Sequence, residues 1–351
     1  KENRRNVMPR NRRWNLKNAV YHVTNRLLEG LPFVPRPFMT KFILGVMARG
    51  QKIHPGVTIH CFLWMGNHYH MVISGNPRKF RDYLGYIEGE IAFAVNRMLG
   101  RRGPLWDGRY SCQLLATWRD VICMMAYIFL NPTRAGLVYK VKQWGGANSW
   151  GFMKKAIKRG ISVFKREFKW YRKGAVGYIK KGLLPSEEAE ILRIWDSKVE
   201  EENDLTVVPF GWKECFDEVR DVSDEALFRR LLKEIKRREK EILPGKKIRG
   251  PHILKVSCMH RQYKSKKRER TPFIICMYDR ELLKALIEQY KEFCNQCDYC
   301  YEEYKNGNRS IVFPDGAFIP SQPSASINLG GDFSELCKDL GFSGLPWNDT
   351  G

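Results

Sequence analysis

The sequence lacks the long apolar stretch that a membrane-spanning helix needs. Its longest uninterrupted apolar run, from Val121 to Leu130, is far shorter than the about 18 residues required to cross a bilayer. No basic segment followed by an apolar one predicts secretion. The ten cysteines lie mostly far apart in a chain too long to need disulfide staples. We therefore expect a cytoplasmic globular protein with no membrane partner.

Acidic residues are much less frequent than basic ones. Lys and Arg number 61 against 38 Asp and Glu, so the 351-residue chain carries a formal net charge of +23. This charge favours a nucleic-acid partner, because each neutralised phosphate releases counterions; a solubilising surface is the alternative. Residues 151–182 hold eleven basic residues, one acidic residue and several aromatic ones. We expect this segment to face phosphates, and whether its aromatic residues stack on bases or pack inward stays open.

The first part of the chain alternates strand and helix patterns. We expect strands over Ala19–Asn25, Val57–Met65, His68–Ser74 and Tyr110–Leu115, and helices over Pro37–Arg49, Arg78–Leu99 and Trp118–Asn131, the last stopped by Pro132. The order of the first six elements matches the split βαβ, ferredoxin-like arrangement, an antiparallel sheet with helices on one face. The predicted class is α+β.

The rest of the chain reads as a mainly helical, basic region. Charged amphipathic patterns predict helices over Leu183–Asp196, Ser223–Ile242 and Asp279–Tyr304, and the tail from Gly307 reads as irregular. The C-x2-C-x2-C spacing of Cys294, Cys297 and Cys300 is compatible with a metal site. The apolar stripe on which Cys294 and Cys297 fall, with Leu283, Ile287, Tyr290, Tyr301 and Tyr304, favours a helix core instead.

Two histidines stand together directly after a Gly66-Asn67 turn. His68 and His70 lie two residues apart in a predicted strand, so both side chains point to the same face. Two imidazoles in adjacent positions on one face can share a divalent metal ion. A chance His-x-His pattern in a strand is the plainer alternative.

A tyrosine and an asparagine mark the predicted helix 118–131. Tyr127 interrupts an apolar run in which Phe would be the simpler choice, and its hydroxyl needs a partner if it is buried. Asn131 follows one turn later on the same face. A core tyrosine and a helix C-terminal asparagine are the ordinary interpretation of this spacing.

Four sequence blocks resemble one known family in the same order. WMGNHYHMVISG (Trp64–Gly75) resembles the His-hydrophobic-His motif of HUH endonucleases, and YHVTNR (Tyr21–Arg26), GPLWDGRY (Gly103–Tyr110) and AYIFLNPTRAGLV (Ala126–Val138) resemble further blocks of the single-tyrosine HUH transposases, specifically the REP-associated tyrosine transposase group. The resemblance spans about Trp14 to Trp150 and does not reach the last part of the chain.

The resemblance implies a mechanism and a set of site residues. By position, His68 and His70 are ligands of a divalent metal, Mg²⁺ or Mn²⁺, with Asn131 as the third ligand, and Tyr127 is the nucleophile that attacks a DNA phosphate. The product is a covalent 5′-phosphotyrosine link that a second 3′-hydroxyl can reverse. The expected substrate is single-stranded or hairpin DNA, and action as a monomer is implied, although dimeric relatives exchange their tyrosine helices.

Basic residues near these blocks are the candidate DNA contacts. They are Arg12, Arg13, Arg26, Arg101, Arg102, Arg109 and Arg134. We expect a catalytic domain over residues 1–150, a basic DNA-contact linker over 151–210, and a mainly helical accessory domain with an irregular tail over 211–351. Two other functions stay open: a non-catalytic nucleic-acid-binding protein, and a relaxase or replication initiator with the same chemistry.

Overall fold

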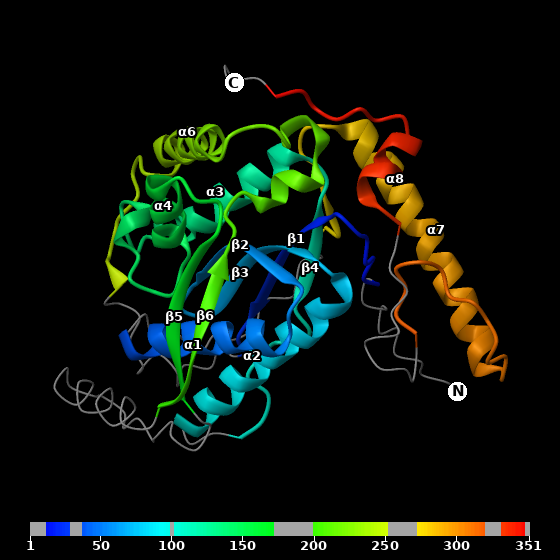
Figure 1. The fold of residues 1–351 in the computed structure, drawn as a ribbon, viewed down its shortest axis with the longest axis horizontal. Helices are drawn as coiled ribbons and strands as arrows, with labels where there is room; N and C mark the ends of the chain where they lie inside the picture. Colours follow the sequence, from blue (N-terminus) through cyan, green and yellow to red (C-terminus); the bar gives the residue numbers. More distant parts are fainter. Residues whose placement is uncertain are drawn as a thin grey trace.

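The computed structural model describes residues 12–28, 37–98, 102–171, 199–251, 272–319 and 331–347. The predicted helix over 183–196, Arg101, and most of the basic stretch after residue 246 lie outside these ranges. Within them a central sheet is sandwiched between two groups of helices (Figure 1).

The central sheet has the strand order β2-β3-β1-β4-β7. Its strands are β1 (Val20–Arg26), β2 (Val57–Trp64), β3 (His68–Gly75), β4 (Ser111–Leu115) and β7 (Ile274–Ile275). The first four are antiparallel to their neighbours, whereas β7 adds to the edge parallel to β4. This is the strand order of a split βαβ fold, so the predicted α+β, ferredoxin-like class is confirmed.

Helices α1 (Pro37–Ile53) and α2 (Pro77–Met98) cover one face of this sheet, as predicted. Alternate residues of β1 and β3 point toward α2: the Tyr21 ring packs edge-on against Phe80 at 5.6 Å, and the Tyr69 hydroxyl donates to Glu88 at 2.7 Å. The residues between them, including His22 and His70, therefore point to the opposite face.

The opposite face is covered by α3 (Trp118–Arg134). The helix begins at a capping box in which the Thr117 and Asp120 side chains each accept from the other's backbone N–H. The prediction that Pro132 ends the helix is wrong, because α3 continues to Arg134. Pro132 lies in the last turn, where its missing N–H removes only one helical bond, and the N–H groups of Ala135 and Leu137 donate to the carbonyls of Asn131 and Pro132.

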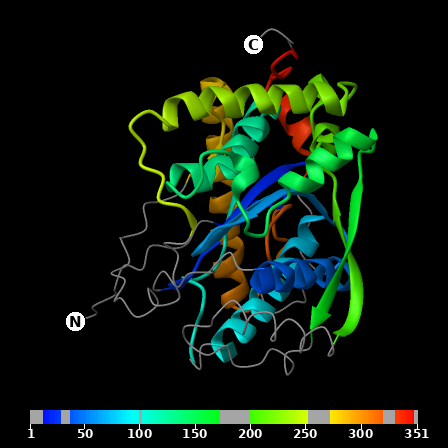
Figure 2. The ribbon, with the colours of Figure 1, turned by 90° about the vertical axis from the view of Figure 1, so that its left-hand side faces the viewer.

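A strand hairpin that the sequence pattern did not reveal packs against α1. It consists of β5 (Phe164–Tyr171) and β6 (Val199–Val207), and Figure 2 shows it along one side of the molecule. The backbone of β5 approaches α1 at Gly45, where any Cβ would overlap the Lys169 carbonyl oxygen. Trp170 lies under the Arg49 guanidinium, 3.8 Å away, and is buried. The described aromatic residues of this segment therefore pack inward.

Two helices extend the fold above α3. They are α4 (Trp150–Arg159) and α6 (Asp224–Ile242), and α6 lies along α3 and α4 (Figures 1 and 2). The predicted helix 223–242 is confirmed, with Ser223 as its N-cap. Short 3-10 turns, η2 (Val141–Gln143), η3 (Gly211–Cys215) and η4 (Asp217–Val219), connect these parts.

The C-terminal part runs along the β4 edge of the sheet. Helix α7 (Arg280–Lys305) confirms the predicted helix, with Asp279 as N-cap. Of the predicted stripe, Cys297 is buried and all the other members except the exposed Ile287 are partly buried against the core. The fully buried positions also include Leu282, Leu286, Phe293 and Cys300. The tail is not wholly irregular, since α8 (Phe333–Asp339) forms beside α7 (Figure 1). Among the described residues, no helix combines the length and apolarity needed to span a bilayer.

We expect the stability of the fold to depend on His60, a fully buried residue of β2. Its Nδ1–H donates to the Val208 carbonyl and its Nε2 accepts from the Ser74 hydroxyl, both at 2.8 Å. Burial lowers its pKa to about 4. Because the unfolded chain binds a proton near pH 6.5, His60 alone should lower the free energy of unfolding by about 3 kcal/mol as the pH drops from 7 to 4.

Urea unfolding at pH 7 and pH 4.5 measures this dependence. His60→Gln should lose stability at pH 7 but show a smaller decrease on acidification than the wild type. His54→Gln, at the end of α1 and only half-buried, is the control and should keep the wild-type pH dependence. Equal pH dependence in all three proteins would contradict the assignment.

Candidate functional site

Three histidines gather on the face of the sheet that α3 covers. His68 and His70 lie two residues apart on β3, and their rings are 4.9 Å apart and nearly perpendicular. His22 lies on the neighbouring strand β1, and its ring stacks on that of His70 at 5.1 Å. The strand alternation that placed His68 and His70 together also brings His22 beside them, because β1 pairs directly with β3.

A chain of hydrogen bonds determines which nitrogen of His70 carries the proton. The Gln113 amide donates to the Pro272 carbonyl at 2.7 Å, so its oxygen faces Nδ1 of His22, 2.8 Å away. His22 must then donate through Nδ1 and accept at Nε2, where Nδ1 of His70 lies 2.9 Å away. His70 therefore donates through Nδ1 and keeps a lone pair on Nε2.

Helix α3 brings two side chains to this lone pair. The Asn131 amide nitrogen lies 3.1 Å from Nε2 of His70, and Asn131 also lies beside His68. Tyr127, one turn earlier, places its ring 5.6 Å from that of His70, edge to face. The i, i+4 spacing survives because α3 continues through Pro132 without turning Asn131 away.

Burial keeps all three imidazoles neutral at pH 7. It lowers the pKa of His22 to about 4 and that of His68 to about 4, and it lowers the pKa of His70 well below its ordinary value, with His68 and His22 adding to this effect. A neutral imidazole has a lone pair to offer, whereas a protonated one has none. His68 points its Nδ1 to the Asn67 side-chain oxygen at 2.7 Å, so its lone pair is also on Nε2.

This donor set fits a divalent metal ion. The lone pairs of His68 and His70 and, once the Asn131 amide rotates, its oxygen would supply three ligands, and the remaining positions would be left to water and substrate. Within the described part of the chain, no group of three or more His, Cys, Asp or Glu side chains qualifies as a metal site. A metal here would therefore depend on Asn131 completing the set.

The Tyr127 hydroxyl is available for chemistry. The ring is half-buried, and no residue in the described ranges forms a hydrogen bond with its hydroxyl. The exposed guanidinium of Arg134 lies over the ring, 5.0 Å from its centre. Arg134 thus adds positive charge beside the tyrosine instead of capping α3, whose C-cap is Ala135.

The other predicted DNA contacts do not all lie near Tyr127. Arg26 is paired with His68 in the sheet and forms an ion pair with Asp107 at 2.6 Å. Arg102 is exposed. Arg12, Arg13 and Arg109 line a pocket on the other face, between β4, α2 and α7. Arg101 lies outside the described residues.

Sequence analysis missed His22 and Gln113. Both lie within predicted strands, and a signal was present: in a split βαβ fold the first strand pairs with the third and fourth. A polar residue of β1 on the same face as His70 must then lie next to it. No local pattern, however, marks Gln113 as the residue that orients His22.

Comparison with known proteins finds one weak structural similarity. No family model matches the chain, and no curated protein matches it. A solved structure of a REP-associated tyrosine transposase bound to a REP hairpin is similar over 50% of this chain and 94% of that chain, with 15% sequence identity and a TM-score of 0.35. A likeness this weak carries no argument about function.

We expect His22→Phe to disturb the candidate metal site without removing a candidate ligand. Without its acceptor on Nε2, His70 is no longer held in the tautomer that leaves its own Nε2 free. Mn²⁺ binding measured by calorimetry should weaken about 10- to 100-fold, and the ¹⁵N shifts of His70 should show loss of the single tautomer. His54→Gln is the control. Unchanged affinity with an unchanged His70 tautomer would contradict this role.

Proposed function

We propose that this chain is a metal-dependent single-stranded DNA endonuclease and strand transferase of the tyrosine transposase type. The observation that supports it best is the meeting of His70 on β3 with Asn131 and Tyr127 on α3. Strand β3 and helix α3 are far apart in the sequence, yet they place the ring of Tyr127, the proposed nucleophile, next to His70. A protein that only binds nucleic acid has no need of this combination.

His68, His70 and Asn131 would hold the metal, which when bound supplies positive charge to a phosphate oxygen of the strand and stabilises the transition state. Two nitrogen ligands suit Mn²⁺ better than Mg²⁺, which prefers oxygen. The neutral state of both imidazoles, imposed by burial, keeps the ligands ready at pH 7.

The proposed reaction is a transesterification at phosphorus. The Tyr127 hydroxyl oxygen attacks, its proton is lost, and a P–O bond forms while the bond from phosphorus to the 3′-oxygen breaks. The departing 3′-oxygen takes up a proton, so the strand ends in a 3′-hydroxyl and the other end is a 5′-phosphotyrosine. No phosphoester is lost, so a second 3′-hydroxyl can reverse the step and join a new strand.

Two further features suit DNA as the substrate. The net charge of +23 attracts a phosphate backbone, and Arg134 places one cation beside the nucleophile. The tyrosine and the histidines come from the same chain, so a single copy holds the complete proposed site. We therefore propose that the protein acts as a monomer on single-stranded or hairpin DNA.

Tyr127→Phe should abolish covalent adduct formation. The substrate is a hairpin oligonucleotide with a single-stranded flank, drawn from repeats near the gene and labelled at its 3′ end, because the 3′ fragment stays on the tyrosine. With Mn²⁺, the wild type should give a labelled protein band on a denaturing gel, and EDTA should remove it. Tyr139→Phe, which alters an exposed tyrosine just beyond α3, should behave as wild type.

Different failures have different meanings. An adduct that persists in Tyr127→Phe would show that another residue is the nucleophile. Tight DNA binding without adduct under any metal would favour a non-catalytic binding protein.

Asn131 is expected to act through its oxygen. Asn131→Asp keeps an oxygen ligand and should retain Mn²⁺ binding, whereas Asn131→Leu, which has the same branching but no oxygen, should weaken it by about tenfold or more. Calorimetric titration with Mn²⁺ measures this directly. Equal affinity in the two variants would exclude Asn131 from the metal site.

A further inference from the structure

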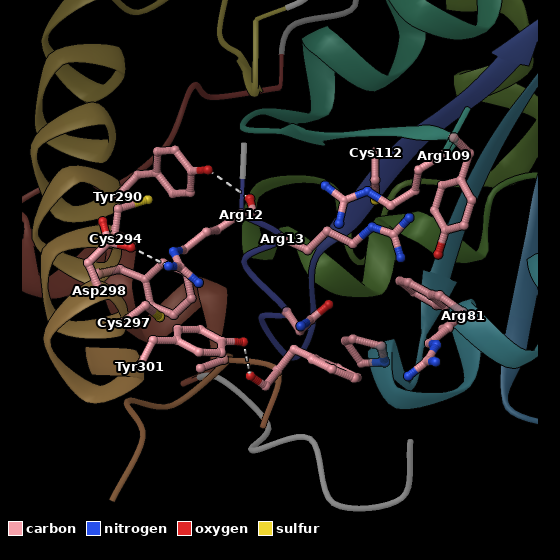
Figure 3. A pocket seen from close by; sticks show the side chains of 17 residues that line it. Arg12, Arg13, Arg81, Arg109, Cys112, Tyr290, Cys294, Cys297, Asp298 and Tyr301 are labelled. Atoms are coloured by element: carbon pink, nitrogen blue, oxygen red, sulfur yellow. Dashed lines mark hydrogen bonds and ion pairs between the residues drawn. The ribbon is translucent and has the colours of Figure 1, made fainter. Parts of the chain in front are cut away.

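A basic and aromatic pocket lies on the face of the sheet opposite Tyr127. Its volume is about 620 Å³, and it opens between β4, α2 and α7 (Figure 3). Cys112, one of its lining residues, pairs with Val23 of β1 and so shares the face that α2 covers. The pocket is therefore separated from His68, His70 and Tyr127 by the sheet itself.

One wall of this pocket carries excess positive charge. Four arginines, Arg12, Arg13, Arg81 and Arg109, line it with a single acidic residue, Asp298. Arg12 forms an ion pair with Asp298, and no other carboxylate lines the pocket. Figure 3 shows Arg13, Arg81 and Arg109 on the side away from α7.

Arg13 shows that an acceptor is missing. Its guanidinium lies over the Tyr110 ring, 3.7 Å from the centre, and its Nη2 atom is buried without a hydrogen-bond partner in the described part of the chain. A buried charged donor with no acceptor is costly. A ligand that brings a negatively charged oxygen into the pocket would remove this cost.

The opposite wall is aromatic and comes from the C-terminal part. The Tyr290 hydroxyl donates to the Arg12 carbonyl at 2.7 Å, and the Tyr301 hydroxyl donates to the Phe318 carbonyl at 2.6 Å. These bonds hold both rings in place. The Phe318 ring is 38% exposed, and the Arg81 guanidinium lies 4.9 Å from its centre. Arg12 likewise lies over the Tyr301 ring, 4.5 Å from its centre. Each ring therefore has one face against an arginine, and a base would stack on the other face.

We propose that this pocket binds one nucleotide of a single DNA strand, with the phosphate against the arginines and the base against Phe318 and Tyr301. The inference rests on the proposed function in taking the ligand from the substrate strand. The volume suits a ligand of this size, and cationic grooves with stacking rings are how single strands are held.

The C-terminal part would therefore be half of a DNA-binding site. The arginines precede or belong to the elements of the ferredoxin-like unit, whereas Tyr290, Tyr301 and Phe318 come from α7 and the segment after it. The C-terminal wall contains no arginine or lysine, so the phosphate contact has to come from the other wall.

Fluorescence anisotropy with a labelled single strand of about 12 nucleotides, measured over a range of salt concentrations, separates the two contacts. Arg81→Gln should weaken binding and make the slope of log affinity against log salt shallower by about 0.7. Phe318→Ala should weaken binding about tenfold with no change of slope. Lys284→Gln, which removes an exposed charge of α7 outside the pocket, should match the wild type in affinity and slope.

Binding by the pocket variants and adduct formation by Tyr127 test the pocket and the nuclease activity separately. If the wild type forms the Tyr127 adduct but both pocket variants bind like Lys284→Gln, the pocket is overturned and the catalytic proposal stands. Pocket-dependent binding without any adduct supports the pocket and overturns the nuclease. Binding of neither the oligonucleotide nor free dTMP overturns the pocket, and pocket-dependent binding of dTMP that matches the oligonucleotide identifies a free nucleotide as the ligand.

Discussion

The hydrogen-bond chain from the Pro272 carbonyl to Nε2 of His70 is the constraint on which the candidate site depends. A carbonyl can only accept, so it orients the Gln113 amide, which orients His22, which in turn decides where His70 carries its proton. The burial that keeps these imidazoles neutral also makes any unsatisfied member of the chain costly. Orientation of the His70 imidazole therefore begins in the C-terminal part of the protein, far along the sequence from β3.

The central sheet divides the molecule into two chemical environments. On the α3 side, neutral imidazoles, an amide and a tyrosine form a site with few charges beyond Arg134. On the α2 side, guanidinium groups and aromatic rings line a wide pocket. A single strand that contacts both must pass around the edge of the sheet. The β4 edge is where β7 and α7 have been added, and this gives the C-terminal part its proposed role in holding DNA.

Packing also explains how β5 can be rich in basic residues and still belong to the core. The density of basic residues in β5 suggested a solvated, phosphate-facing segment, yet Phe164, Phe168 and Trp170 are buried against α1 and α4, while the lysines between them point outward. Gly45 permits this close approach. The same strand can be both basic and part of the core, because its successive side chains point to opposite faces.

Several features of this protein follow from local periodicity and could be predicted from its sequence. Alternation in β3 placed His68 and His70 on one face, helical spacing placed Tyr127 and Asn131 one turn apart, and element order predicted the α+β sheet. Contacts in the folded protein were needed to show that His22 and Gln113 orient His70, that α3 continues through Pro132, and that Arg13 and Phe318 share a pocket. These depend on contacts between residues distant in the chain, and periodicity within a segment carries no information about its partners.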